Sequence, residues 1–151
     1  MDKIEIKKKI IEFAKIELKK KIDFLNKIID DEQKESASHK GRMESRYDTF
    51  KEEAQMRRDA YKKQLFDTQN LLLIINEIPL KINKSIQIGS IIETNEKIYF
   101  ISIGVLGPIK INKQDYVLIS PESPIGQILL QKKCGDEFEF RGKKIKIKNI
   151  F

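Results

Sequence analysis

The uneven distribution of proline and glycine is the feature that most constrains the fold of this 151-residue chain. All four prolines and six of the seven glycines lie after residue 78, and Gly41 is the only glycine before it. Because both residue types interrupt helices and form turns, the first half should contain long helices and the second half short elements joined by turns. The sequence therefore predicts two domains, residues 1–78 and 79–151.

Apolar residues in the first half recur at helical spacing, mainly every seven positions. The first series is Ile4, Ile11, Leu18 and Leu25, with Ala14, Ile22, Ile28 and Ile29 beside it; the second is Tyr47, Ala54, Tyr61, Thr68 and Ile75, with Met43, Phe50, Leu65 and Leu72. Two helices, about residues 2–36 and 44–77, are therefore predicted to pair as an antiparallel coiled-coil hairpin with its tip near residues 36–44. Each would be about 50 Å long, so we expect the hairpin to project.

The second half alternates apolar and polar residues, as strands do. Strands are predicted within residues 85–94, 97–104, 115–120, 136–142 and 143–151. One helix is predicted among them: Ser123 suits its N-cap, Pro124 its first turn, and Gly135 a left-handed stop. Lys132 and Lys133 suit the negative end of its dipole. The fold class is therefore α+β, with a coiled-coil hairpin followed by a small antiparallel sheet domain that contains one short helix.

Charge is unevenly divided between the halves. Residues 1–78 contain 18 Lys and Arg against 16 Asp and Glu, whereas residues 79–151 contain 12 against 7. The basic excess of the second half favours an acidic partner, either a phosphate backbone or a protein. Lysines that protect strand edges from pairing explain the same excess equally well.

The sequence gives little reason to expect a membrane-spanning helix, a disulfide bond or a zinc site. No stretch approaches the roughly 20 consecutive apolar residues that a membrane-spanning helix needs, and the N-terminus lacks a signal-peptide core, so a cytoplasmic location without membrane partners is expected. Cys134 and His39 are each the sole residue of their type. Cys134 is expected to be a small packing residue, and His39 a solvated loop residue.

The segment Ser120–Phe140, "SPESPIGQILLQKKCGDEFEF", carries a family resemblance. Together with the preceding coiled coil it resembles the Gre family of bacterial transcript-cleavage and elongation factors. Their FKBP-like C-terminal domain typically contains a Ser-Pro-Ile-Gly/Ala-x-x-Leu-Leu-x-Lys-x-x-Gly-Asp run. The residues that match this run in order are Ser123, Pro124, Ile125, Gly126, Leu129, Leu130, Lys132, Gly135 and Asp136.

The resemblance implies a polymerase-binding factor that is not itself an enzyme. Its sheet domain would dock outside bacterial RNA polymerase while the coiled coil enters the secondary channel, meeting nascent RNA or DNA only indirectly, through the elongation complex. The resemblance also implies DNA binding and a location in the cytoplasm. The residues assigned to polymerase docking are Ser123, Pro124, Ile125, Gly126, Lys132 and Lys133.

The tip departs from the family pattern. Cleaving factors usually have Gly-Asp-x-x-Glu-Asn there, to complete the shell of a second magnesium ion in the polymerase active site. With Gly41 aligned, Arg42 and Ser45 occupy the two acidic positions. A shifted pair, Glu44 and Asp48, lies at i,i+4 spacing and is the candidate catalytic and metal-ligating pair, with Mg²⁺ shared with the polymerase and no cofactor of the chain's own. Ordinary solvated helix charges are the competing interpretation, and the alternative acids on the first helix are Asp30, Asp31, Glu32 and Glu35.

Three functional hypotheses remain open. The first is a polymerase-binding elongation factor, acting either as a cleavage cofactor or as a channel-occupying regulator without cleavage activity. The second is an FKBP-like prolyl isomerase, which the few available aromatic residues disfavour. The third is a coiled-coil interaction adaptor unrelated to transcription, which would bind through the helices.

Overall fold

The computed structural model describes residues 2–38 and 44–151, without the side chains of residues 35–38 and 44–47. It divides into two compact units, one formed by Ile16–Leu73 and the other by Met1–Lys15 together with Ile74–Phe151. We call them the hairpin unit and the sheet unit. The predicted domains at 1–78 and 79–151, and the projection of the hairpin, stay predictions.

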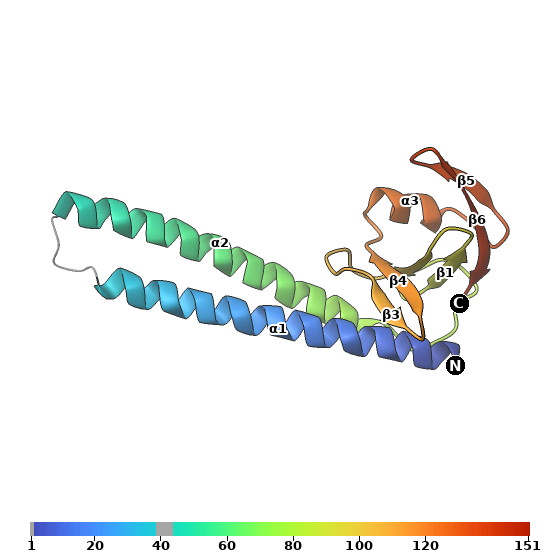
Figure 1. The fold of residues 1–151 in the computed structure, drawn as a ribbon, viewed down its shortest axis with the longest axis horizontal. Helices are drawn as coiled ribbons and strands as arrows, with labels where there is room; N and C mark the ends of the chain where they lie inside the picture. The colour runs from blue at the N-terminus through green and yellow to red at the C-terminus, as the bar shows by residue number, and fades with distance from the viewer. Residues whose placement is uncertain (1, 39–43) are drawn as a thin grey trace. The chain divides into compact units, whose positions relative to one another are not determined.

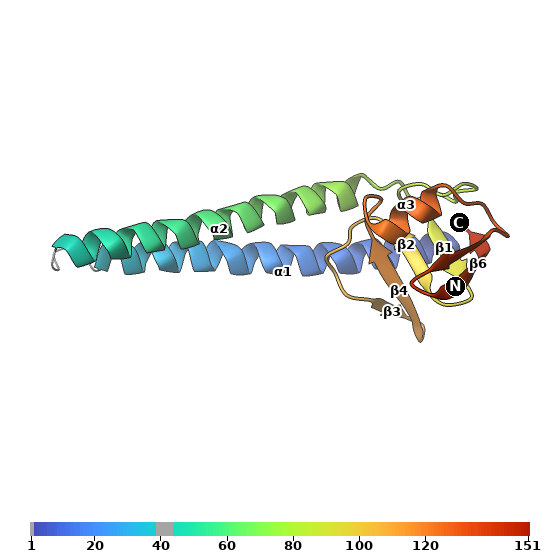
Figure 2. The ribbon, with the colours of Figure 1, turned by 90° about the horizontal axis from the view of Figure 1, so that it is seen from above.

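Two long helices are the main elements of the first half, as predicted. Helix α1 spans Lys3–Ser38 and α2 spans Glu44–Glu77. Within the hairpin unit they lie side by side (Figures 1 and 2), and Leu18, Leu25 and Ala54 are buried along the predicted heptad positions. Thr68 is also buried, and its hydroxyl donates to the Gln64 carbonyl at 2.7 Å, so a polar residue is tolerated in the seam.

An ion pair between described residues of the hairpin unit joins α1 to α2. The Arg57 Nε lies 3.0 Å from the Glu32 carboxylate, whose side chain is only 18% exposed. Because Glu32 is half-buried, its charge is less screened than those of the fully exposed carboxylates along the same helix. The pair therefore links the two helices through a contact between residues far apart in the sequence.

The sheet unit contains six strands in the order β3-β4-β2-β1-β6-β5. Their bounds are β1 Ile91–Thr94, β2 Ile98–Ile101, β3 Ile109–Ile111, β4 Gln114–Ile119, β5 Glu137–Phe140 and β6 Lys143–Ile150. Strands β2 and β4 pair in parallel, and the other neighbours pair antiparallel. The expected α+β class is confirmed, but the sheet is mixed rather than wholly antiparallel.

Strand β3, absent from the prediction, explains the parallel pair. Its hairpin with β4 turns at Asn112 and Lys113, whose φ values of 49° and 67° fit a two-residue turn with both central residues left-handed. The chain thus runs back along the outside as β3, and β4 then returns in the same direction as β2, between β3 and β2. The three-residue length of β3 gave too short an alternation to detect.

The first strand is also shorter than the sequence predicted. Only Ile91–Thr94 of residues 85–94 is extended in the sheet. The preceding residues form a turn in which the Ser90 N–H donates to the Gln87 carbonyl at 3.0 Å, while the Ser90 hydroxyl accepts from the Gln87 N–H and donates to the Ser85 carbonyl. Serine side-chain bonds of this kind compete with strand pairing.

Helix α3, Pro124–Leu130, covers one face of the sheet (Figure 1). Ile125 and Leu129 pack there in a buried cluster that also contains Ile86, Ile92, Tyr99, Ile101, Ile119, Ile145 and Ile147. Alternation along the strands places these side chains on a single face. The core of the sheet unit is therefore closed by the helix that carries the family-like run.

The first turns of α1 belong to the sheet unit. The Lys7 ammonium, which has no exposed surface, donates to the Lys81 carbonyl at 2.7 Å. The Lys3 ammonium lies 4.8 Å from the centre of the Phe151 ring, and Phe151 exchanges two backbone hydrogen bonds with Ile91. Residues from both ends of the sequence are thus joined in one unit.

Candidate functional sites

The loop before α3 is built around Ser123, as predicted. Ser123 has an extended backbone, with φ −65° and ψ 155°, and its hydroxyl oxygen accepts from the Gly126 N–H at 3.1 Å. The same hydroxyl donates to the Ser120 carbonyl at 2.7 Å. Pro124 fills the first turn, where a missing N–H costs nothing. The segment to which the sequence analysis assigned polymerase docking therefore forms the N-terminal cap of α3.

Gly126 is required by a close backbone approach. A Cβ atom added there would lie 2.2 Å from the Ser120 carbonyl oxygen and 2.9 Å from the Ser123 hydroxyl. Ile125 and Gly126 are buried, whereas Pro124 is exposed and Ser123 is half-buried. Of the residues assigned to docking in this run, Ile125 and Gly126 thus shape the loop from within, and Pro124 is the one that it presents to solvent.

A pocket of about 260 Å³ opens beside this cap. Its apolar part includes Tyr99, Val117 and Ile119, and its charged side chains are Lys97 and Arg141. The Arg141 guanidinium lies 5.1 Å from the centre of the Phe140 ring, a cation–π distance. Burial, with a smaller contribution from Glu96, raises the pKa of Tyr99. The lining therefore combines apolar side chains with two positive ones.

Sequence analysis missed Lys97 and Arg141. Lys97 lies between β1 and β2, and Arg141 lies between β5 and β6 with a φ of 52°. These two turns come together only through the sheet order. The Arg-Gly pair was recognisable as a turn, but nothing in the sequence placed it beside the Ser123 cap.

The lysines after α3 lie outside the helix, contrary to the expectation that they would sit at its end. The helix ends at Leu130, where the Gln131 N–H donates to the Ile128 carbonyl and the Lys132 N–H donates to the Leu129 carbonyl. Lys132 is half-buried and Lys133 is exposed. Gly135 does have a positive φ, 90°, but lies in the following turn, where the Asp136 carboxylate accepts from the Lys133 N–H at 2.8 Å. The helix is thus shorter than predicted because this second turn follows it.

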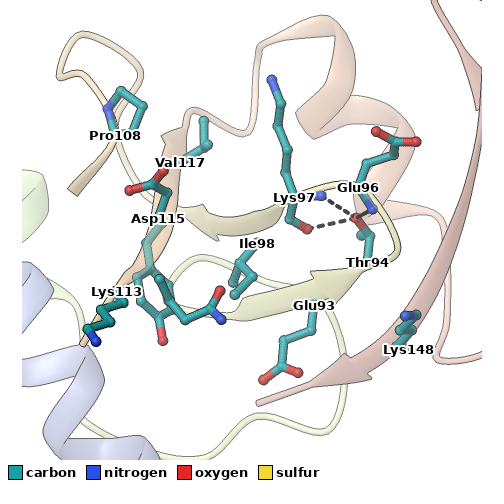
Figure 3. A pocket seen from close by; sticks show the side chains of 12 residues that line it. Glu93, Thr94, Glu96, Lys97, Ile98, Pro108, Lys113, Asp115, Val117 and Lys148 are labelled. Carbon is teal, nitrogen blue, oxygen red and sulfur yellow. Dashed lines mark hydrogen bonds between the residues drawn. The ribbon is translucent and has the colours of Figure 1, made fainter. Parts of the chain in front are cut away.

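A larger, more polar pocket of about 690 Å³ lies near the β1–β2 turn (Figure 3). Among its labelled residues, Lys97, Lys113 and Lys148 lie well apart, and Thr94 receives hydrogen bonds at the turn. Glu96 and Asp115 lie 3.8 and 3.9 Å from Lys143 and Lys110, respectively. Mixed, spread charges of this kind favour no single ligand.

The candidate carboxylates lie at the start of α2. Glu44 is its first residue and Asp48 follows one turn later, so the backbone places both on one side of the helix. Asp48 is exposed, whereas the Glu44 and Ser45 side chains are not described. Gly41, Arg42 and His39 lie outside the described residues. Of the alternative acids on α1, Asp30 and Asp31 are exposed, and Glu32 is bonded to Arg57.

Within the described residues, no group of three or more His, Cys, Asp or Glu side chains is arranged to hold a metal ion. Two carboxylates one helical turn apart nevertheless suit a cation that has other ligands, because magnesium typically takes only one or two protein carboxylates. Among the described helices, none has the length and apolarity needed to cross a membrane.

Comparison with known proteins assigns the sheet unit to a class. Residues 82–150 match the family model described as "Transcription elongation factor, GreA/GreB, C-term". The crystal structure of the GreA factor homolog 1 (Gfh1) protein of Thermus thermophilus is similar over 91% of this chain and 94% of that chain, with 14% identity and a TM-score of 0.38. That likeness is too weak to support an argument by itself. No curated protein matches significantly.

The fold and the match define a domain of the transcription elongation factors. More particularly, residues 82–150 are similar to the C-terminal domain of the GreA/GreB factors, and two long helices precede them as the sequence predicted.

Proposed function

We propose that this protein is an RNA polymerase-binding elongation factor whose α1–α2 hairpin enters the secondary channel. The observation that supports it best is the family match of residues 82–150, preceded by two paired helices of 36 and 34 residues. A helix of this length spans about 50 Å, which suits a probe that must reach a deep site.

Docking outside the polymerase is assigned to the region of the Ser123 cap. Pro124 and Lys133 are its exposed members, Ser123 and Lys132 are half-buried, and Ile125 and Gly126 hold the loop in shape. Binding can be measured with the full-length chain and core polymerase. Pro124→Asp should weaken it at least tenfold, because a charge replaces an apolar contact, whereas Val105→Asp, a matched change at an exposed apolar residue outside the family-like run, should not.

The tip carboxylates Glu44 and Asp48 are proposed to serve the polymerase active site. They are the residues that would hold a second magnesium ion there, and the ion when bound supplies an activated water for cleavage of backtracked RNA. Their own role is to direct carboxylate oxygens from one side of α2. Arg42 and Ser45, at the usual acidic positions, favour the other outcome, a factor that occupies the channel without stimulating cleavage.

RNA shortening in a backtracked elongation complex separates the two outcomes. If the chain stimulates cleavage through this pair, Glu44→Ala and Asp48→Ala should each slow it by ~10-fold to ~1000-fold, the effect of losing a metal ligand, with polymerase affinity unchanged. Wild-type chain that binds but never shortens the RNA is a channel-occupying regulator. Equal cleavage by wild type and both variants would move the search to Asp30, Asp31, Glu32 and Glu35.

Failure of the full-length chain to bind polymerase would refute this proposal and favour the coiled-coil adaptor. The prolyl isomerase hypothesis has its own test, because isomerisation of a proline peptide requires no polymerase. We expect none, since Tyr99 and Phe140 are the only aromatic residues that line the pocket beside the cap.

A further inference from the structure

An apolar groove of about 500 Å³ lies in the sheet unit, apart from the residues assigned to docking. It is lined by Pro79, Ile86, Ile88, Pro121 and Leu130, with Lys81 as its charged side chain and Gln87 as its polar one. We call it the 79–88 groove. Its volume is within the range of sites that bind ligands, and its lining is mostly apolar.

Aliphatic side chains are unusually exposed at this groove and on its loop. Leu80, Ile82 and Ile88 expose 45%, 48% and 47% of their surface, and Leu130 exposes 39%. Single exposed aliphatic residues are ordinary, but several on one short segment beside a groove are characteristic of interaction surfaces.

The loop that carries them is fixed by its own polar contacts. Asn83 is only 3% exposed and its side chain accepts from the Gln87 amide at 2.5 Å. Ser90 bonds to both Gln87 and Ser85, and the Gly89 N–H donates to the Ile101 carbonyl at 2.8 Å. Because the loop is ordered before any partner arrives, binding costs little conformational entropy. These contacts hold apolar side chains in water, an arrangement suited to recognition.

Charge indicates the chemistry of the partner. Residues 78–92 contain Lys81 and Lys84 and no acid. Among the ion pairs of the described residues, none includes Lys81 or Lys84. The buried Lys7 ammonium donates to the Lys81 carbonyl, and burial together with the Lys81 charge lowers the pKa of Lys7 to about 8. Glu77 and Glu122 adjoin the groove in the sequence but do not line it.

We propose that the 79–88 groove binds a segment of a partner protein whose Leu or Ile side chains are flanked by Asp or Glu. The aliphatic side chains fill the apolar lining, and the carboxylates meet Lys81 in that lining and Lys84 on the same loop beside it. This inference does not depend on the polymerase proposal, since none of the residues assigned to polymerase docking lines the groove.

The test uses the full-length chain and two synthetic peptides. Both are amphipathic, with Leu at helical spacing, and their polar positions are Glu in one and Lys in the other. The Glu peptide should bind at least tenfold more tightly by calorimetry, and it should shift the NMR methyl signals of Ile86, Ile88 and Leu130. Equal affinity for both peptides, or shifts confined to other residues, would overturn the proposal.

Variants separate specific docking from general stickiness. Ile88→Asn should weaken binding of the Glu peptide about tenfold, whereas Val105→Asn, an equally drastic change at a 58% exposed residue outside the groove, should leave it unchanged. If Ile88→Asn alters the fold, Leu130→Asn serves instead. Unchanged affinity in the groove variant would contradict the proposal.

Charge reversal gives a readout that loss of folding cannot imitate. The double variant Lys81→Glu with Lys84→Glu should prefer the Lys peptide. Continued preference for the Glu peptide would show that these lysines do not select the partner. Sedimentation of the chain alone is the last experiment. If the chain self-associates and Ile88→Asn abolishes this association, the groove is occupied by a second copy of the chain, and the proposal of an acidic partner is refuted.

Discussion

Replacement of Gly126 by alanine should destabilise the sheet unit, although alanine is the better helix former. The new methyl group would lie 2.2 Å from the Ser120 carbonyl oxygen, so this backbone must move by about 1 Å to restore an ordinary contact. Ser120 accepts hydrogen bonds from the Ser123 N–H at 3.2 Å and the Ser123 hydroxyl at 2.7 Å. Movement of Ser120 therefore disturbs the cap as well as the packing.

The magnitude follows from these opposing effects. Overpacking costs about 1–3 kcal/mol and a weakened cap bond about 1 kcal/mol, while replacing glycine inside a helix recovers about 1 kcal/mol. The net loss in free energy of unfolding is about 2 kcal/mol, which corresponds to a fall in Tm of roughly 10 °C for a unit of this size.

Calorimetry gives Tm, and hydrogen exchange of β4 and α3 amides shows whether the loss lies in the sheet unit. Gly107→Ala is the matched control, because a Cβ atom there has no neighbour within 4 Å and the backbone is not left-handed. It should be neutral or slightly stabilising. The family run accepts alanine at the position of Gly126, so a variant within about 0.5 kcal/mol of wild type would refute the reasoning for this chain.

Three further predictions concern other contacts. Ser123→Ala should lower the free energy of unfolding of the sheet unit by about 1 kcal/mol in urea titrations, and no change would mean that the hydroxyl does not cap α3. Lys7 has a folded pKa of about 8, below its unfolded value of 10.5, so the unfolded chain binds an extra proton between these pH values and the free energy of unfolding should rise with pH there. The rise should be smaller in Lys7→Met. Equal dependence of stability on pH in both proteins would contradict burial of the Lys7 charge. Arg57→Ala should lower the free energy of unfolding by about 1 kcal/mol, because half-buried Glu32 loses its partner. Lys34→Ala, which removes an exposed ion pair, should lower it by almost nothing. Equal effects of the two variants would show that the Arg57–Glu32 pair stabilises the hairpin no more than an exposed pair does.

Local signals explain which elements were predictable. The heptad series located α2 at residues 44–77 and α1 to within a turn, because seam burial repeats along the helix. The Ser123-Pro124 pair located the start of α3, because a cap acts through bonds only three residues away. Both signals are contained in short stretches of sequence.

Features set by distant residues were not predictable. The parallel pairing of β2 with β4 depends on β3 lying outside β4, and no local pattern carries strand order. The end of α3 depended on a competing turn at Asp136. In the candidate docking run, the spacing could not show that Ile125 and Gly126 are buried, or that Arg141 lies beside them.

The discontinuous make-up of the sheet unit has a consequence for folding. Its two segments, ending at Lys15 and resuming at Ile74, are separated by the whole hairpin unit, which is continuous in sequence. If the helices pair first, they replace a long flexible connection by a short one, which reduces the entropy cost of joining the segments by about 2 kcal/mol. In that case, prior pairing of the helices speeds folding of the sheet unit. Arg57→Ala, which weakens the pairing, should slow formation of the β1–β6 pair even though Arg57 lies in the other unit.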